Sequence, residues 1–238
     1  MSALAQRVVM ITGVSGNLGS AVAQAFRKAG ASTVLIDRDA TRLHHLYADL
    51  VRSPDHLLLG GVNLADESSV ATAVDSAVER FGRIDVLINT VGAWRGGKPV
   101  HETPLSDWAL LHETNVLPTL LTSRGVIPHF LRQKSGRIIN VAARSGLTAD
   151  AGSAGYSMSK SAVLRLTEAL SAELKTHGIN VNAVLPSTID TPQNRLSMPG
   201  SDYSKWVAPA ALVDVIVFLA SDASRAIHGA AIPVYGLG

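Results

Sequence analysis

A glycine-rich turn near the N-terminus constrains the fold more than any other stretch. The apolar run 8–11 precedes the turn, a helix pattern follows over 20–28, and a second apolar run, 32–36, ends at Asp37. Continuous apolar runs of this length are typical of parallel strands that are buried on both faces. The stretch therefore predicts a strand, a helix and a second strand parallel to the first.

The same turn has the features of a dinucleotide-binding site. Glycines let the backbone approach a pyrophosphate, whose charge is met by free N–H groups at the helix start. Asp37 follows at about the spacing at which an acidic residue binds a ribose hydroxyl. A turn that merely packs tightly would not explain that acidic residue. The turn residues predicted to bind the dinucleotide are Gly13, Ser15, Gly16, Asn17, Leu18 and Gly19.

The residues after the second strand bear on the choice of cofactor. The Asp37 carboxylate would repel a 2′-phosphate and accept hydrogen bonds from a 2′-hydroxyl, which favours NAD(H). The adjacent Arg38 could instead clamp a phosphate. The sequence thus favours NAD(H) and leaves NADP(H) open.

The rest of the chain continues the alternation of strands and helices. We expect a doubly wound parallel sheet of the Rossmann type, with right-handed crossovers and helices on both faces. One domain spans 1–238, with a polar, turn-rich substrate lid at about 187–207. The further strands are expected at 57–62, 84–89, 137–141, 179–185 and 230–234, and the further helices at 40–52, 66–81, 103–130, 156–175 and 208–220.

Ligands bind such a sheet outside the carboxyl ends of its strands. Polar and small residues follow the third and fourth predicted strands, and Pro186 follows the sixth. We therefore expect these residues to line the same crevice as the glycine turn. The candidates for cofactor binding from this group are Asn63, Leu64, Asn89 and Gly92.

Tyr156 and Lys160 are four residues apart, so on a helix they share one face. An ammonium that close favours the ionised phenol, so we expect the pKa of Tyr156 to lie below its free value of about 10. Such a phenol can give a proton to a carbonyl oxygen or take one from an alcohol. The alternative is a surface tyrosine beside a solvated lysine. The place of the pair after the fifth strand, at the ligand-binding edge, favours catalysis.

Composition and charge exclude several other functions. The chain has 21 Lys and Arg against 19 Asp and Glu, a net charge of +2, and no long basic run, so nucleic-acid binding has no electrostatic footprint. It has no cysteine, and its histidines lack the spacing of metal ligands. The N-terminus lacks the pattern of a secretion signal, and no apolar run is long enough for a membrane span. We expect a soluble cytoplasmic protein.

Two predicted helices carry apolar residues on more than one face, which suggests that another subunit covers them. A homodimer or homotetramer is expected, and a better-buried monomer is the alternative. The residues concerned are Leu110, Leu111, Leu117, Leu120 and Leu121 in 108–130, and Val163, Leu164, Leu166, Leu170 and Leu174 in 156–175.

These motifs together resemble the short-chain dehydrogenase/reductase family over nearly the whole chain. Thr12-Gly13 with Gly19, Asn89 with Gly92, and Tyr156 with Lys160 match its motifs. The resemblance implies an NAD(P)(H)-dependent oxidoreductase that acts on a small molecule. By that resemblance, Tyr156 is the general acid and base, Lys160 tunes it and holds the nicotinamide ribose, and Asn115 positions a water. The residues implied to contact the nicotinamide carboxamide are Pro186, Ile189 and Thr191.

Three positions depart from the family pattern. Asn17 occupies the position of the family's middle glycine. We expect a left-handed backbone there, which asparagine tolerates better than other non-glycine residues. Ser187 replaces the glycine after Pro186, and Ala143 stands where the catalytic serine is expected, thirteen residues before Tyr156. Losing one such hydrogen-bond donor typically costs about 10²–10³-fold in rate. Ser145 or another donor substitutes, or the substrate does not need one.

One branch of the family, the quinonoid dihydropteridine reductases, also lacks the serine. The stretch 185–206 and the loop with Trp94, Gly96 and Gly97 are similar to that branch, although Asn115 follows the general family. A quinonoid ring accepts hydride readily, so reductase activity of this kind is an alternative to carbonyl chemistry. A catalytically silent dinucleotide-binding protein is the second alternative, suggested by Ala143. The candidate substrate contacts are Ala143, Ser145, Trp94, Arg195 and Trp206, although the last two could instead staple the lid to the surface.

Overall fold

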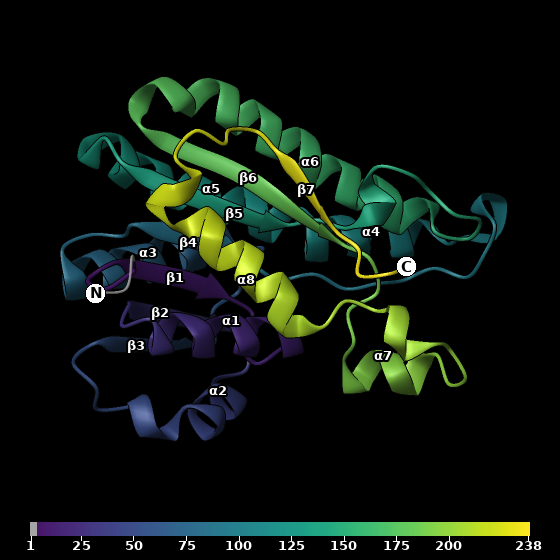
Figure 1. Cartoon of the computed structure of the whole chain (residues 1–238), viewed down its shortest axis with the longest axis horizontal. Helices are drawn as coiled ribbons and strands as arrows, with labels where there is room; N and C mark the ends of the chain where they lie inside the picture. The colour runs from purple at the N-terminus through teal and green to yellow at the C-terminus, as the bar shows by residue number, and fades with distance from the viewer. Residues whose placement is uncertain (1–3) are drawn as a thin grey trace.

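The computed structural model describes residues 4–238, and residues 1–3 of the domain expected over 1–238 lie outside the described part. The fold is a seven-stranded parallel sheet in the order β3-β2-β1-β4-β5-β6-β7, with helices on both faces (Figure 1). The chain winds outward in one direction from β1 to β3 and in the other from β4 to β7. This confirms the doubly wound Rossmann-type sheet.

The strands lie close to the predicted runs. They are β1 (Val8–Thr12), β2 (Ser32–Asp37), β3 (His56–Gly60), β4 (Val86–Asn89), β5 (Gly136–Val141), β6 (Ile179–Pro186) and β7 (Ala231–Val234). The third strand stops at Gly60, two residues earlier than predicted. The next residue, Gly61, has a φ of +78° and leaves the extended conformation.

Two helix predictions need correction. The helix expected over 40–52 ends at Leu46, because Tyr47 leaves the helical region (φ −124°, ψ 34°) and only a 3₁₀ turn follows. The segment expected as one helix over 103–130 is two helices, because Pro118 cannot continue a helix from the preceding turn. The helices are α1 (Asn17–Lys28), α2 (Ala40–Leu46), α3 (Glu67–Phe81), α4 (Leu105–Asn115), α5 (Leu117–Gln133), α6 (Ala154–Leu174), α7 (Pro192–Ser197) and α8 (Pro209–Ala220).

The core has one layer on each side of the sheet. Successive residues of β1 point to opposite faces: Val9 and Ile11 pack with α1 and α8, while Val8 and Met10 pack with α3 and α5. All four side chains are buried, and each such burial stabilises the fold by about 1.5–3 kcal/mol. The sheet is therefore fixed from both sides, and its carboxyl edge can hold irregular loops in defined places.

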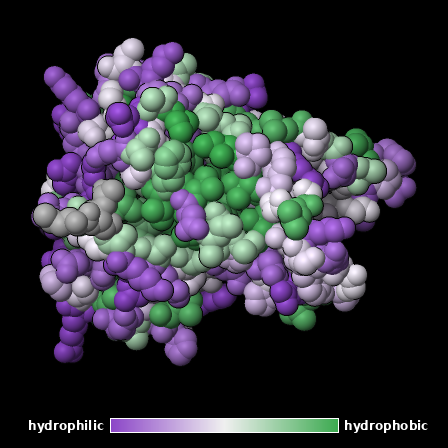
Figure 2. Space-filling model, in the orientation of Figure 1, coloured by the Kyte–Doolittle hydropathy of each residue, from purple (hydrophilic) through white to green (hydrophobic). Residues whose placement is uncertain are grey.

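Large apolar side chains are exposed on several helices, including Leu105 at 85% on α4 and Met158 at 62% on α6. Most of the leucines named above in α4, α5 and α6 are buried or partly buried within the chain, and Leu110 is the exposed one among them, at 42%. Figure 2 shows apolar side chains gathered over α8 and β7, where Phe218 is 41% exposed. Between residues 4 and 238, no helix is long and apolar enough to cross a membrane.

Candidate active site

A cleft of about 600 Å³ opens at the carboxyl edge of the sheet, beside the first four strands. It is lined by nine of the predicted residues: Gly13, Ser15, Gly16, Asn17, Asp37, Arg38, Asn63, Leu64 and Gly92. Sequence reasoning missed ten others: Asp39, Arg42, Val62, Ala65, Thr90, Val91, Glu113, Thr114, Pro118 and Gln193. Gln193 comes from α7, so one side chain of the expected lid reaches this cleft.

The glycine turn at the cleft is built by close backbone contact. Gly13 has a φ of +69°, and a Cβ on Gly19 would lie only 2.2 Å from the Gly13 carbonyl oxygen. Asn17 is the first residue of α1 and has no positive φ, so the expectation that it takes a left-handed backbone is wrong. The substitution is tolerated because this position is already helical.

The turn leaves several hydrogen-bonding groups free. Within residues 4–238, the buried Ser15 hydroxyl has no partner, and neither do the amides of Asn17, Leu18 and Gly19. A buried polar group without a partner costs free energy, so such a group calls for a ligand or water. These donors at the start of α1 fit the pyrophosphate of a dinucleotide.

Asp37 is held in place at the same cleft. Its carboxylate accepts hydrogen bonds from the backbone amide of Ser15 at 2.8 Å and from that of Asp39 at 3.1 Å. Arg38 and Arg42 also line the cleft, and neither guanidinium forms an ion pair in the described part of the chain. The carboxylate is fixed and the guanidiniums are free to move, as a site for the adenosine ribose requires.

Tyr156 and Lys160 lie in the first two turns of α6. Lys160 is buried, and its Nζ donates a hydrogen bond to the Val141 carbonyl at 3.0 Å. A Cβ on Gly92 would lie 2.9 Å from this Nζ and 3.2 Å from Asn115 Oδ1. Gly92 lines the cleft, so Lys160 and Asn115 lie next to one residue of its lining, but Tyr156, Lys160 and Asn115 do not themselves line it.

The pKa expectation for the tyrosine is wrong in this structure. Burial raises the pKa of Tyr156 to about 12, and burial lowers the pKa of Lys160 to about 8. Removal from water penalises the charged form of both groups, and this is the cause of both shifts. Tyr156 is therefore a neutral phenol that holds its proton, and Lys160 is a weakened cation.

Asn115 is a clamp between two elements. Its Oδ1 accepts from the Ala93 amide at 2.7 Å, and its Nδ2 donates to the Ala93 carbonyl at 3.0 Å and to Ser159 Oγ at 2.9 Å. Ser159 Oγ in turn donates to the Tyr156 carbonyl at 2.7 Å. The buried side chain thus ties the loop after β4 to the helix that carries the phenol. Ser159 was missed by the sequence analysis, and only its place inside the Tyr156–Lys160 motif could have pointed to it.

Asn89 acts below the cleft and does not line it. Its Nδ2 donates to Asn140 Oδ1 at 3.0 Å, and its Oδ1 accepts from Thr122 Oγ1 at 2.8 Å. Asn140 continues this network to Thr167 on α6 at 2.9 Å. The buried network joins β4, β5, α5 and α6 and fixes the floor of the site.

The lid residues are tied to one another. Arg195 forms a two-pronged ion pair with Asp190, at 2.6 and 2.7 Å, and its guanidinium carbon lies 4.8 Å from the ring centre of Tyr203. The Tyr203 and Trp206 rings are 4.7 Å apart. These contacts join lid residues to one another, so both readings of Arg195 and Trp206, as substrate contacts or as ties between the lid and the surface, stay predictions.

The residues expected at the nicotinamide carboxamide do not line the cleft here. Pro186 ends β6, Ile189 bridges to Val207, and Thr191 caps α7 by accepting from the Asn194 amide. Leu18 and Gly19 also lie outside the lining. These residues position the turn and the lid.

No hydroxyl replaces the missing serine directly. Ala143 is buried just after β5, and Ser145 follows in a 3₁₀ turn, where its hydroxyl is partly exposed. Ser145 makes no side-chain hydrogen bond to any residue from 4 to 238. Trp94 is 66% exposed beside the site. Nowhere in 4–238 do three or more His, Cys, Asp or Glu side chains gather as metal ligands would.

Comparisons with known proteins agree with this site. A family model described as short chain dehydrogenase matches residues 7–200. The chain is 34% identical to 2-(R)-hydroxypropyl-CoM dehydrogenase of Xanthobacter autotrophicus over 97% of each chain. It is 32% identical to meso-2,3-butanediol dehydrogenase of Serratia marcescens, over 97% of this chain and 93% of that one.

Solved structures of related proteins have the same fold over nearly their whole length. An NAD⁺-bound xylitol dehydrogenase superposes with a TM-score of 0.88 at 26% identity, covering 98% of this chain and 99% of that one. A structure of ElxO with NADP bound also gives 0.88 at 26% identity, covering 97% of this chain and 98% of that one. The similarity to quinonoid dihydropteridine reductase stays a prediction. With a family model that matches residues 7–200 and relatives of matching length, the chain belongs to the short-chain dehydrogenase family of NAD(P)-dependent oxidoreductases.

Proposed function

We propose that this protein moves hydride between a nicotinamide cofactor and a small carbonyl or alcohol substrate, with Tyr156 transferring the proton. The observation that supports the proposal is the position of Gly92, which lines the cleft and lies so close to Lys160 and Asn115 that a Cβ there would come within 2.9 Å of Nζ and 3.2 Å of Oδ1. The proposal places the Tyr156 phenol at this same edge of the sheet. The bound nicotinamide would supply or accept the hydride.

The protein's own residues supply the proton chemistry. A partly buried phenol with a pKa of about 12 keeps its proton at neutral pH and can donate it to a carbonyl oxygen as negative charge develops there. The Lys160 ammonium, four residues along the same helix, would stabilise the phenolate that remains. In alcohol oxidation the same groups work in reverse.

The cofactor is proposed to be NAD(H). Two backbone amides fix the Asp37 carboxylate in the cleft, where it would accept a hydrogen bond from a 2′-hydroxyl and repel a 2′-phosphate. The free Arg38 and Arg42 are the features that favour NADP(H). Among the structural neighbours, xylitol dehydrogenase holds NAD⁺ and ElxO holds NADP. Comparing kcat/KM for NADH and NADPH decides between them, and a preference for NADPH would overturn this assignment.

The test of the reaction is NADH oxidation with a panel of ketones and aldehydes beside quinonoid dihydropterin. Tyr156→Phe should bind NADH as tightly as the wild type and lose about 10²–10⁴-fold in turnover, since it lacks the transferable proton. Unchanged turnover in this variant would remove Tyr156 from the mechanism.

Turnover of the dihydropterin alone would favour the second candidate function, quinonoid dihydropteridine reductase activity, for which the buried Ala143 is the supporting observation. Tight NADH binding with no turnover of any substrate would favour a silent binding protein.

We also propose a homo-oligomer. The apolar surface over α8 and the edge strand β7 supports this assembly (Figure 2), and the exposed Leu105 and Leu110 on α4 offer an alternative surface. An open sheet edge beside an apolar helix is a surface that another chain can cover.

A further inference from the structure

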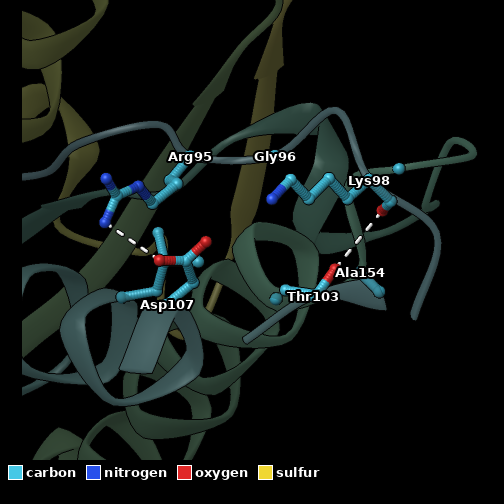
Figure 3. Close-up of a pocket in the computed structure, with 9 residues that line it drawn as sticks. Arg95, Gly96, Lys98, Thr103, Asp107 and Ala154 are labelled. Atoms are coloured by element: carbon cyan, nitrogen blue, oxygen red, sulfur yellow. Dashed lines mark hydrogen bonds and ion pairs between the residues drawn. The ribbon is translucent and has the colours of Figure 1, made fainter. Parts of the chain in front are cut away.

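A second cavity lies beside the catalytic helix and is separate from the residues that line the dinucleotide cleft. It measures about 210 Å³ and lies between the loop after β4, the helix α4 and the start of α6. Its lining residues are Arg95, Gly96, Lys98, Thr103, Asp107, Leu111, Gly152, Ala154 and Gly155 (Figure 3). None of the functions above uses this cavity.

Main-chain contacts form the rim of the cavity. The Gly97 amide donates to the Gly152 carbonyl at 2.8 Å, and the two glycines have φ values of +98° and +76°. A Cβ on Gly96 would lie 2.6 Å from the same carbonyl oxygen. Glycine is required here because the loop and the start of α6 meet backbone to backbone. These main-chain contacts fix the loop against the start of α6, while the exposed side chains of Arg95 and Lys98 complete the lining.

The charge inside the cavity is positive. Arg95 pairs with Asp107 at 3.0 Å, which neutralises both groups. Lys98 extends its side chain toward this pair, and its ammonium forms no hydrogen bond or ion pair anywhere in the described chain (Figure 3). Two cations therefore face a single carboxylate. The adjacent Leu111 provides an apolar wall.

We propose that this cavity binds a small organic anion through a carboxylate or phosphate group, with Lys98 as its main partner. Charge-assisted hydrogen bonds from an ammonium to such an oxygen are among the stronger polar contacts in proteins. The cavity holds roughly seven waters at about 30 Å³ each, which suits a short-chain acid or a phosphate monoester. Gly155 in its wall directly precedes Tyr156, so a bound anion touches the backbone that carries the phenol.

Malonate is a suitable probe, with malonamide as its uncharged control. Binding is measured by isothermal titration calorimetry at constant ionic strength, because added salt alone would screen the charges. We expect malonate to bind the wild type and malonamide not to bind. Failure of malonate to bind the wild type would overturn the proposal. This test needs no turnover, so it stands or falls separately from the proposed reaction.

Charge variants should change malonate affinity in opposite directions. Lys98→Met should weaken binding by about tenfold or more, because the free ammonium is lost. Asp107→Asn should tighten it severalfold, because Arg95 then becomes a second free cation. Lys28→Met is the matched control, since Lys28 is an exposed lysine at the end of α1, and it should bind malonate as the wild type does.

Two results would locate malonate elsewhere. Equal affinity in Lys98→Met and the wild type, or a loss in Arg42→Met instead, would place the anion outside this cavity and refute the assignment. Melting temperatures without malonate show that each variant is folded.

Once a carbonyl substrate is known, competitive inhibition by malonate would identify the site as one for the acid group of the substrate, and non-competitive inhibition would identify a separate effector site.

Discussion

Tyr156 and Lys160 illustrate how burial changes two residues that the sequence pairs. Four-residue spacing on a helix places them on one face, but it gives no information on how much water reaches them. In the structure Lys160 is buried and Tyr156 is partly buried, so the loss of water raises the pKa of the phenol and lowers the pKa of the ammonium. The buried lysine therefore lowers the stability of the fold at neutral pH.

Lys160→Met should abolish most turnover and stabilise the fold at pH 7. The pKa of Lys160 falls from 10.5 to about 8 in the folded protein, which corresponds to a cost of about 3 kcal/mol at neutral pH. The variant loses the hydrogen bond to Val141, worth about 1 kcal/mol, so the net gain is about 2 kcal/mol.

The pH dependence of unfolding checks this prediction. Between pH 8 and 10.5 the unfolded wild type binds more protons at this lysine than the folded form, so wild-type stability rises with pH through that window. Below pH 8 the free-energy cost of burying the charged Lys160 is fully present. The advantage of Lys160→Met should therefore be largest at pH 7 and should fade toward pH 10.5 in urea unfolding. A variant less stable than the wild type at pH 7 would contradict it.

Ala143→Ser restores the hydroxyl that the family pattern leads one to expect. Since Ala143 is buried directly after β5, a serine there would add a donor that an ordinary ketone needs and a quinonoid ring does not. We expect kcat/KM for ketones to rise by about tenfold or more, with a smaller effect on quinonoid dihydropterin. Equal effects on both substrates would undercut this explanation of the missing serine.

At the scale of elements, the site depends on how α4, α6 and the loop after β4 are joined. Asn115 and Ser159 link these three elements through four hydrogen bonds, all between 2.7 and 3.0 Å. The link holds Gly92 against Lys160 and fixes the first turn of α6. The hydrogen bonds of Asn115 and Ser159 thus position the helix α6 that carries Tyr156.

Ser159→Ala should lower kcat by about tenfold or more while leaving NADH affinity unchanged, because small displacements of a catalytic group are costly. Ser159→Thr keeps the hydroxyl and should recover part of the rate. Ser157→Ala is the control: Ser157 is equally buried in α6, but it contacts Ser153. Steady-state kinetics and NADH titration measure both effects. A similar loss in both alanine variants would indicate general damage to α6.

At the scale of the whole molecule, apolar surface lies over α8 and β7 (Figure 2) and also at Leu105 and Leu110 of α4. Phe218 is the exposed aromatic residue of α8.

Phe218→Glu should therefore dissociate the proposed oligomer, because it buries a charge in the interface. Size-exclusion chromatography with light scattering measures the mass. Leu46→Glu is the control, since Leu46 is exposed to a similar degree, 45% against 41%, on α2. Leu110→Glu tests the alternative surface on α4. Dissociation by Leu110→Glu alone, or a monomeric wild type, would refute the α8–β7 assembly.

The sequence by itself determined the sheet, the glycine turn and the place of the catalytic pair. Strand runs, glycine spacing and helix periodicity are local patterns, and the carboxyl ends of parallel strands must meet at one edge. Nine predicted cofactor residues therefore line the cleft. Only the tertiary structure decided the partners of Asn89 and Asn115 and the pKa shifts of Tyr156 and Lys160. Hydrogen-bond partners and desolvation depend on segments distant in the chain, which no local pattern records.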